Sequence, residues 1–244
     1  MARFHLPPAA WHSGILDGDE ARHLSQVLRI KTGETITVFD GMGLRASAEV
    51  LTVSRDRVSL KLGESLASRP PLPAITLAQA IPKGKNMDLI VQKSVELGVS
   101  AIHPLITRHT IVQPGEGKSE KWRRNALEAC KQCGQDTLPE IAEPLGFDPW
   151  IAQQAAASSL KLIASLAPGA RSFRDVLREH ANTEAVTFLV GPEGDFAPEE
   201  VSAAINGGFI PVSLGSIILR VETATLFGIS ALRYEFDLSQ APDT

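Results

Sequence analysis

Two short glycine-containing segments near the C-terminal end of the chain are well suited to hold a ligand. One reads Gly191-Pro-Glu-Gly194 and the other Leu214-Gly215, and each follows an apolar run typical of a strand. Glycine lets a ligand approach the backbone closely and tolerates positive φ angles. Each glycine alone could simply turn the chain. Two at matching strand ends favour a binding site, because open α/β sheets bind ligands outside the carboxyl ends of their strands.

These segments do not match the common nucleotide motifs. Neither fits the G-x-G-x-x-G dinucleotide pattern or the GxxxxGK[ST] phosphate loop, so the ligand need not be a dinucleotide or a triphosphate. Cys130-x-x-Cys133 has the spacing of a zinc half-site, but the chain has only two cysteines and no close histidine pair to complete it. Both cysteines fall on one face of a predicted helix, so we expect them in the core and expect no metal site.

The chain from residue 74 onward alternates between strand and helix patterns. The predicted strands are 75–81, 99–106, 161–164, 185–190 and 209–214. Helices are predicted at 84–97, 119–134 and 223–236. Further helices begin near Asp148 and Ser172, and another begins at Pro198 and ends at Gly207. This alternation predicts an α/β fold with a mostly parallel sheet and helices on both of its faces.

Residues 1–64 show a different pattern. Strands are predicted at 35–39, 46–53 and 58–62, with Asp40-Gly41 and Gly43 as hairpin signals between the first two, and a helix at 20–30. A small β-barrel-like module is the natural interpretation. Three prolines make 65–73 unsuitable for helix or sheet, so we predict a linker there and two domains, 1–70 and 74–244.

Composition and charge limit the class of protein. No apolar run approaches the length of a membrane helix, no secretory signal begins the chain, and the cysteines form no disulfide framework, so we expect a cytoplasmic protein without a membrane anchor. The net charge is −4, yet residues 81–131 carry nine lysines and arginines against five acids. Local basic patches decide phosphate contacts, so the distribution permits RNA binding, although a single lysine is more often just solvated.

Several motifs occur together in order along the chain. They are Arg22–Arg29 (RHLSQVLR), Ala80–Lys85 (AIPKGK), Val91–Gly98 (VQKSVELG), Glu128–Gly134 (EACKQCG), Phe188–Glu200 (FLVGPEGDFAPEE), Val212–Gly215 (VSLG) and Ile218–Ala224 (ILRVETA). Each is weak alone, but the ordered set resembles the bacterial 16S ribosomal RNA (uracil-N3)-methyltransferase family of the SPOUT class. The resemblance covers most of the chain.

This resemblance implies a fold, a cofactor and partners. The fold would be a PUA-like RNA-binding β-barrel followed by an α/β domain knotted as a deep trefoil, and the protein would be a homodimer. S-adenosylmethionine would be the cofactor, and 16S ribosomal RNA in the small ribosomal subunit the substrate. The residues that match the cofactor-binding positions are Leu189, Gly191, Gly194, Leu214, Gly215 and Leu219. Candidates for RNA contact are Arg22, His23, Arg29, Lys83 and Lys85.

The chemistry of N3 methylation assigns roles to three further residues. N3 of uridine is a poor nucleophile until its proton leaves, and the nitrogen must be aligned with the sulfonium methyl group. Arg220 is the candidate to stabilise the negative charge that develops on O2 and O4, or to bind an RNA phosphate. Glu193 and Glu222 are candidates to accept the proton, directly or through water. Without a catalytic role, Arg220 would be a surface arginine that caps a helix. Glu222 would be a negative charge that is favourable at the start of a helix.

Some positions depart from the pattern of the family. Asp195 stands where a glycine is commoner and adds charge beside the cofactor site. Ser216, Ile217 and Val221 replace a proline or lysine, an arginine and a threonine, and Ile217 removes a potential phosphate contact. Two alternatives therefore stand beside N3 methylation. One is a related SPOUT enzyme that methylates a ribose 2′-OH or another base, and the other is an RNA-binding protein without catalysis.

Overall fold

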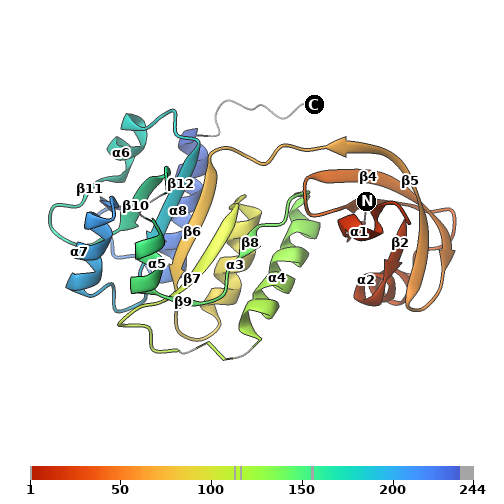
Figure 1. Ribbon diagram of the computed structural model, residues 1–244, viewed down its shortest axis with the longest axis horizontal. Coiled ribbons are helices and arrows are strands. Elements are labelled where there is room, and N and C mark those ends of the chain that lie inside the picture. Colours follow the sequence, from red (N-terminus) through yellow and green to blue (C-terminus); the bar gives the residue numbers. More distant parts are fainter. Residues whose placement is uncertain (1, 113, 116, 155–156, 237–244) are drawn as a thin grey trace. The chain divides into compact units, whose positions relative to one another are not determined.

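The computed structural model describes residues 2–112, 114–115, 117–154 and 157–236 (Figure 1). The chain divides into two compact units. The first consists of Met1–Pro70 and Leu127–Leu138, and the second of Pro71–Ala126 and Pro139–Thr244. In the part of the chain that the structure describes, no helix is long and apolar enough to cross a membrane.

The first unit contains a five-stranded sheet with the strand order β1-β3-β4-β5-β2. Its strands are β1 (Arg3–His5), β2 (Ile15–Asp17), β3 (Thr35–Phe39), β4 (Leu44–Val53) and β5 (Arg57–Ala67). β1 is parallel to β3, and the other pairs are antiparallel. Ala46, Ala48 and Val50 of β4 are buried while the residues between them are exposed, because successive side chains of a strand point to opposite faces. The β-rich module is confirmed, but β5 extends three residues into the predicted linker.

The helix predicted at 20–30 differs from the one observed. The structure has α1 (Pro8–Trp11), α2 (Gly18–Arg22) and then a π-helical turn, η1 (His23–Val27). The Leu28 N–H donates to the His23 carbonyl at 3.0 Å, and Arg29 has a left-handed φ of 54° that ends the turn. The apolar period of the sequence is misleading here, because Leu24 is buried while Val27 and Leu28 are exposed.

The end of α4 (Lys118–Cys133) and the residues after it complete the first unit. Lys131 Nζ pairs with Glu20 Oε1 at 2.8 Å, and Arg3 Nη2 pairs with Asp136 Oδ1 at 2.7 Å. The side chains of Lys131 and Asp136 are only 7% and 2% exposed. A segment distant in sequence therefore neutralises charged groups of the first strands and of α2.

The second unit contains a parallel sheet with the strand order β11-β13-β10-β12-β6-β7-β8, in which β9 also pairs with β7. Its strands are β6 (Ala74–Ala80), β7 (Ala101–Ile106), β8 (Glu140–Ile141), β9 (Leu145–Gly146), β10 (Leu160–Ala164), β11 (Arg171–Ser172), β12 (Ala185–Val190) and β13 (Ile210–Ser213). Its other helices are α3 (Asn86–Glu96), α5 (Phe147–Gln153), α6 (Phe173–Glu179), α7 (Pro198–Asn206) and α8 (Val221–Phe236). The mostly parallel α/β sheet predicted from the sequence is confirmed.

Helices cover both faces of this sheet, as two neighbouring residues of β12 show (Figure 1). Phe188 stacks on Phe173 of α6 at 5.9 Å between ring centroids and lies against Gly228 of α8. Leu189 belongs instead to the buried cluster that contains Trp150 of α5 and residues of α7. Adjacent strand residues point to opposite faces, so α6 and α8 lie on one face and α5 and α7 on the other.

The two cysteines of α4 differ in environment. Cys130 is buried, but Cys133 is exposed, so the expectation that both lie in the core is wrong for Cys133. The helix ends at Cys133, and Gly134 turns away with a φ of 88°, so the buried face does not continue to that residue. Among the described residues, no group of three or more His, Cys, Asp or Glu side chains is arranged to hold a metal ion.

Candidate active site

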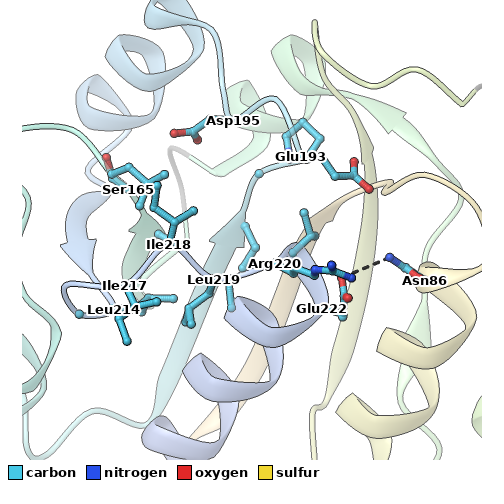
Figure 2. Close-up of a pocket in the computed structure, with 18 residues that line it drawn as sticks. Asn86, Ser165, Glu193, Asp195, Leu214, Ile217, Ile218, Leu219, Arg220 and Glu222 are labelled. Carbon is cyan, nitrogen blue, oxygen red and sulfur yellow. Dashed lines mark hydrogen bonds between the residues drawn. The ribbon is translucent and has the colours of Figure 1, made fainter.

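A pocket of about 490 Å³ lies in the second unit at the carboxyl ends of β10, β12 and β13 (Figure 2). Most of its lining comes from residues 164–166, from 190–193 with Asp195, and from the segment 214–224, and Asn86 of α3 completes it. The three strands are neighbours in a parallel sheet, so the segments that follow them necessarily meet at one edge. The volume is in the range of pockets that bury a small organic ligand.

The segment after β12 forms a tight turn. The Asp195 N–H donates to the Pro192 carbonyl at 2.9 Å, and Asp195 takes a left-handed φ of 58°. Its Oδ1 accepts from the Phe196 N–H at 2.8 Å. A Cβ on Gly191 would lie 3.1 Å from the Phe196 ring, so a side chain there would crowd the buried phenylalanine. Glycine at position 191 therefore allows the turn to pack closely.

The segment after β13 is open toward the pocket. Gly215 has a φ of 132°, and a Cβ there would meet no atom within 4 Å, so its conformation rather than its packing requires glycine. Ile217 and Ile218 are 75% and 78% exposed. The chain then enters α8, where the buried Thr225 hydroxyl donates to Gln79 Oε1 of β6 at 2.6 Å. This bond fixes the beginning of α8 beside the pocket.

Four ionisable side chains line the described pocket: Glu193, Asp195, Arg220 and Glu222. Figure 2 shows the Asp195 carboxylate on the side where Ser165 lies and the Glu193 carboxylate pointing to the other side. Glu193 Oε1 accepts from the Lys83 N–H at 2.9 Å, and Glu222 Oε2 accepts from Asn86 Nδ2 at 3.2 Å. The exposed Arg220 guanidinium has no ion pair among the described residues. Each glutamate thus keeps one carboxylate oxygen for a ligand.

A second, more open cavity of about 530 Å³ shares Glu193 with the first. It is lined by Lys83, Arg108, His109, Thr110, Ile111, Glu193 and Gly194. The sequence interpretation did not include Arg108 and His109. Their position directly after the predicted strand 99–106 was the available signal, because that strand ends at the same edge of the parallel sheet.

The structure brings together most of the predicted site residues. Arg220, Glu193, Glu222, Gly191, Leu214, Gly215 and Leu219 line the first pocket. Leu189 and Gly194 are not in its lining: the Leu189 side chain is buried in the core, and Gly194 lines the second cavity. Lys83 lines the second cavity, and Lys85 is exposed just before α3 without lining either cavity.

The other RNA-contact candidates lie in the first unit, at the junction of α2 and η1. Arg22 pairs with Asp19 and, at 3.8 Å, with Asp56. The His23 ring packs edge-on against Phe4 at 5.9 Å between centroids. Arg29 is exposed in its left-handed conformation. Of the two arginines, Arg29 is the one without an ion pair among the described residues.

Comparison with known proteins agrees with this architecture. Residues 68–233 match the RNA methyltransferase domain family, and residues 16–63 match the RNA methyltransferase PUA domain. The ribosomal RNA small subunit methyltransferase E of Synechocystis is 32% identical over 213 residues, which cover 87% of this chain and 70% of that protein. The protein of the same name from Buchnera aphidicola is 32% identical, with 89% of each chain covered.

Solved structures of similar sequence extend this agreement. A methyltransferase from Legionella pneumophila, in complex with S-adenosylmethionine, is 33% identical with a TM-score of 0.86 and covers 96% of this chain and 97% of its own. The ribosomal RNA small subunit methyltransferase E of Neisseria gonorrhoeae, bound to S-adenosylmethionine, is 34% identical with a TM-score of 0.85, covering 97% and 98%. The resemblance seen in the sequence motifs is confirmed, and the chain belongs to the RNA methyltransferase family that includes the bacterial ribosomal RNA small subunit methyltransferase E proteins.

Proposed function

We propose that this protein uses S-adenosylmethionine to methylate N3 of a specific uridine in the 16S ribosomal RNA of the small ribosomal subunit. The main support is the pocket at the ends of β10, β12 and β13, where two glycine turns, an exposed arginine and two glutamates meet. The family assigns RNA methyl transfer to such a chain, and two relatives of similar structure are solved with S-adenosylmethionine.

The residues of the pocket fit this cofactor. Leu214, Ile218 and Leu219 offer apolar surface for the adenine. Gly191 and Gly215 both line the pocket, and the backbone at Gly215 is accessible because no side chain covers it. Carboxylates at 193, 195 and 222 suit a ligand that carries a sulfonium and an ammonium group. When bound, S-adenosylmethionine would supply the methyl group.

The protein side chains would handle the charge and the proton of the uridine. The free oxygen of Glu222 or Glu193 accepts the N3 proton, directly or through one water, while the other oxygen stays bonded to Asn86 or to the Lys83 N–H. The Arg220 guanidinium stabilises the negative charge that then spreads over O2 and O4. These fixed donors orient both carboxylates before the substrate arrives.

Further parts of the proposal concern the whole protein. Residues 1–70 would act as a PUA-like RNA-binding domain, with Arg22, His23 and Arg29 in contact with RNA together with Lys83 and Lys85. Residues 74–244 would form the catalytic domain, knotted as a deep trefoil. The SPOUT class to which the motifs point also favours a homodimer in the cytoplasm.

Transfer of labelled methyl groups tests the function directly. Purified protein is incubated with labelled S-adenosylmethionine and with small subunits, or free 16S RNA, from cells that lack the modification. Nucleoside analysis should recover the label as 3-methyluridine. Label in a 2′-O-methyl nucleoside or another base would support the related enzyme instead, and calorimetry that detects no cofactor binding would support the non-catalytic RNA-binding protein.

A further inference from the structure

The second cavity lies directly beside the proposed catalytic pocket. Glu193 lines both cavities, and its carboxylate accepts a hydrogen bond from the backbone of Lys83, which lines the second cavity. In Figure 2 the Glu193 carboxylate points away from Asp195, on the same side as Arg220, Glu222 and Asn86. One of the two candidate proton acceptors, Glu193, therefore lies in the wall that the two cavities share.

Hydrogen bonds hold the segment that contributes Arg108, His109 and Thr110 to this cavity. The Thr107 N–H donates to the buried Thr110 Oγ1 at 2.9 Å, and the Arg108 N–H donates to Glu200 Oε1, also at 2.9 Å. His109 Nδ1 lies 3.0 Å from the Gly194 carbonyl and 2.9 Å from the Asp195 carbonyl. Both partners can only accept, so Nδ1 carries the proton and the ring is fixed against the turn after β12.

The side chains that face this cavity combine two chemistries. The Lys83 ammonium has no partner among the described residues, and Arg108 has only a surface pair with Glu199 at 3.4 Å, with side chains 65% and 69% exposed. Such a pair is weak and easily exchanged for another anion. The exposed His109 ring and Ile111, which is 68% exposed, offer a flat and apolar surface beside these cations.

Single-stranded RNA presents the complementary groups. Its phosphates bind lysine and arginine, and its unpaired bases stack on flat side chains such as histidine. A paired duplex would present phosphates but no free base face. A nucleic acid whose uridine enters the first pocket must place its next nucleotide close by, and the second cavity is adjacent.

We propose that the second cavity is an RNA subsite that holds the nucleotide next to the uridine being methylated. Its phosphate binds Lys83 and Arg108, and its base rests against His109 and Ile111. This inference rests on the proposed function, because it takes the first pocket to be the site of methyl transfer. It adds that the enzyme requires an unpaired neighbour beside its target.

RNA binding tests the pairing of the two cations with phosphate. Fluorescence anisotropy with a labelled single-stranded oligouridylate is measured for wild type, Lys83→Ala, Arg108→Ala and, as a control, Arg178→Ala. Arg178 is an exposed arginine of the same unit that lines neither cavity. Log affinity falls as log salt rises. For Lys83→Ala and Arg108→Ala, the magnitude of this negative slope should decrease by about 0.7 for each phosphate that is no longer neutralised. Arg178→Ala should keep the wild-type slope.

A second variant tests the base stacking. His109→Asn keeps a donor close to the Nδ1 position, which preserves the bonds to the turn, but removes the ring. Its affinity for the oligouridylate should decrease about tenfold, the size of one base-stacking interaction, with an unchanged salt slope. Its affinity for S-adenosylmethionine, measured by calorimetry, should stay at the wild-type value because the turn is retained.

The outcomes separate this inference from the proposed function. Unchanged RNA affinity and salt slope in Lys83→Ala and Arg108→Ala would overturn the subsite, even if the wild type forms 3-methyluridine. A decrease in cofactor affinity equal to the decrease in RNA affinity in His109→Asn would assign His109 to the turn alone and overturn the base stacking. Wild-type protein that transfers no methyl group would overturn the proposed function, while the binding data would still decide whether the cavity holds RNA.

Discussion

Arg220 combines a fixed backbone with an exposed guanidinium. Its carbonyl accepts from the Ala224 N–H at 2.8 Å, so the backbone is held by the first turn of α8. The side chain lines the pocket without an ion pair in the described part of the chain. A cation held beside a pocket in this way is suited to act on a charge that appears only during the reaction.

Arg220→Ala should therefore lower the rate of methyl transfer by about 10²–10³-fold, as removal of one preorganised charge stabiliser typically does. The affinity for S-adenosylmethionine should remain close to that of the wild type. Single-turnover transfer and calorimetry measure the two quantities, with Arg178→Ala as the control. A collapse of cofactor affinity would mean that Arg220 binds the cofactor rather than the transition state.

The two cysteines should differ sharply in reactivity. Burial raises the pKa of the Cys130 thiol to about 12, so almost no thiolate exists there near neutral pH. Cys133 is exposed at the end of α4. Iodoacetamide followed by peptide mass spectrometry should find Cys133 alkylated first and Cys130 modified only on unfolding. Equal labelling of both in the native protein would contradict the buried position of Cys130.

At the residue scale, the sequence predicted the site residues that follow the two glycine turns. It missed His109, which reaches the site region through the order of the strands in the sheet. Gly191, Gly215, Arg220 and Glu222 follow strand ends along the chain and all line the pocket. His109 reaches the same region only because β7 is parallel to β6, which pairs with β12. No local pattern reveals that strand order.

The packing of α8 on β12 depends on the absence of a side chain at one position. A Cβ on Gly228 would overlap the Phe188 ring, which is fully buried between α6 and α8. Gly228→Ala should lower the free energy of unfolding by about 1–3 kcal/mol, because overpacking shifts the helix. Urea denaturation measures the change. Ser230→Ala, at an exposed position of the same helix, is the control and should have little effect.

If Gly228→Ala were as stable as the wild type, α8 would not lie this close to β12. The same variant reports on the site, because α8 begins beside Arg220 and Glu222. A shifted helix should reduce methyl transfer even under conditions in which the variant remains folded.

Long elements with a clear period were predictable, whereas short elements set by tertiary contacts were not. Strands such as β6 and β12 are apolar and lie in the middle of the sheet, so composition alone indicates them. The two-residue strands β8, β9 and β11 have no pattern of their own and exist because a neighbour pairs with them. In the π-helical turn η1 the apolar pattern is equally uninformative, since Leu24 is buried while Val27 and the following Leu28 are exposed.

At the scale of the molecule, the first compact unit is discontinuous in sequence. It needs residues 127–138 to pair Lys131 with Glu20 and Asp136 with Arg3. Removal of one partner from a buried ion pair typically costs about 3–5 kcal/mol. A fragment of residues 1–70 should therefore lack a cooperative thermal transition.

A matched fragment tests this expectation. Residues 1–70 joined to residues 127–138 by a glycine-serine linker should regain a cooperative transition, followed by circular dichroism and by Trp11 fluorescence. A fragment of residues 1–70 that melts as cooperatively as the joined fragment would show that the later segment is dispensable for this unit.

The discontinuity also governs the order in which the protein can fold during synthesis. The first sheet emerges from the ribosome early, but the lysine and aspartate that neutralise its charges emerge only with residues 127–138. Meanwhile β6 and β7 are already made, and their sheet waits for β12, near the end of the chain. Neither unit can be completed before the other has begun, so nascent chains expose unfinished sheet edges for most of translation. Translation pauses or premature stops after residue 138 should therefore be better tolerated by the first unit than by the second.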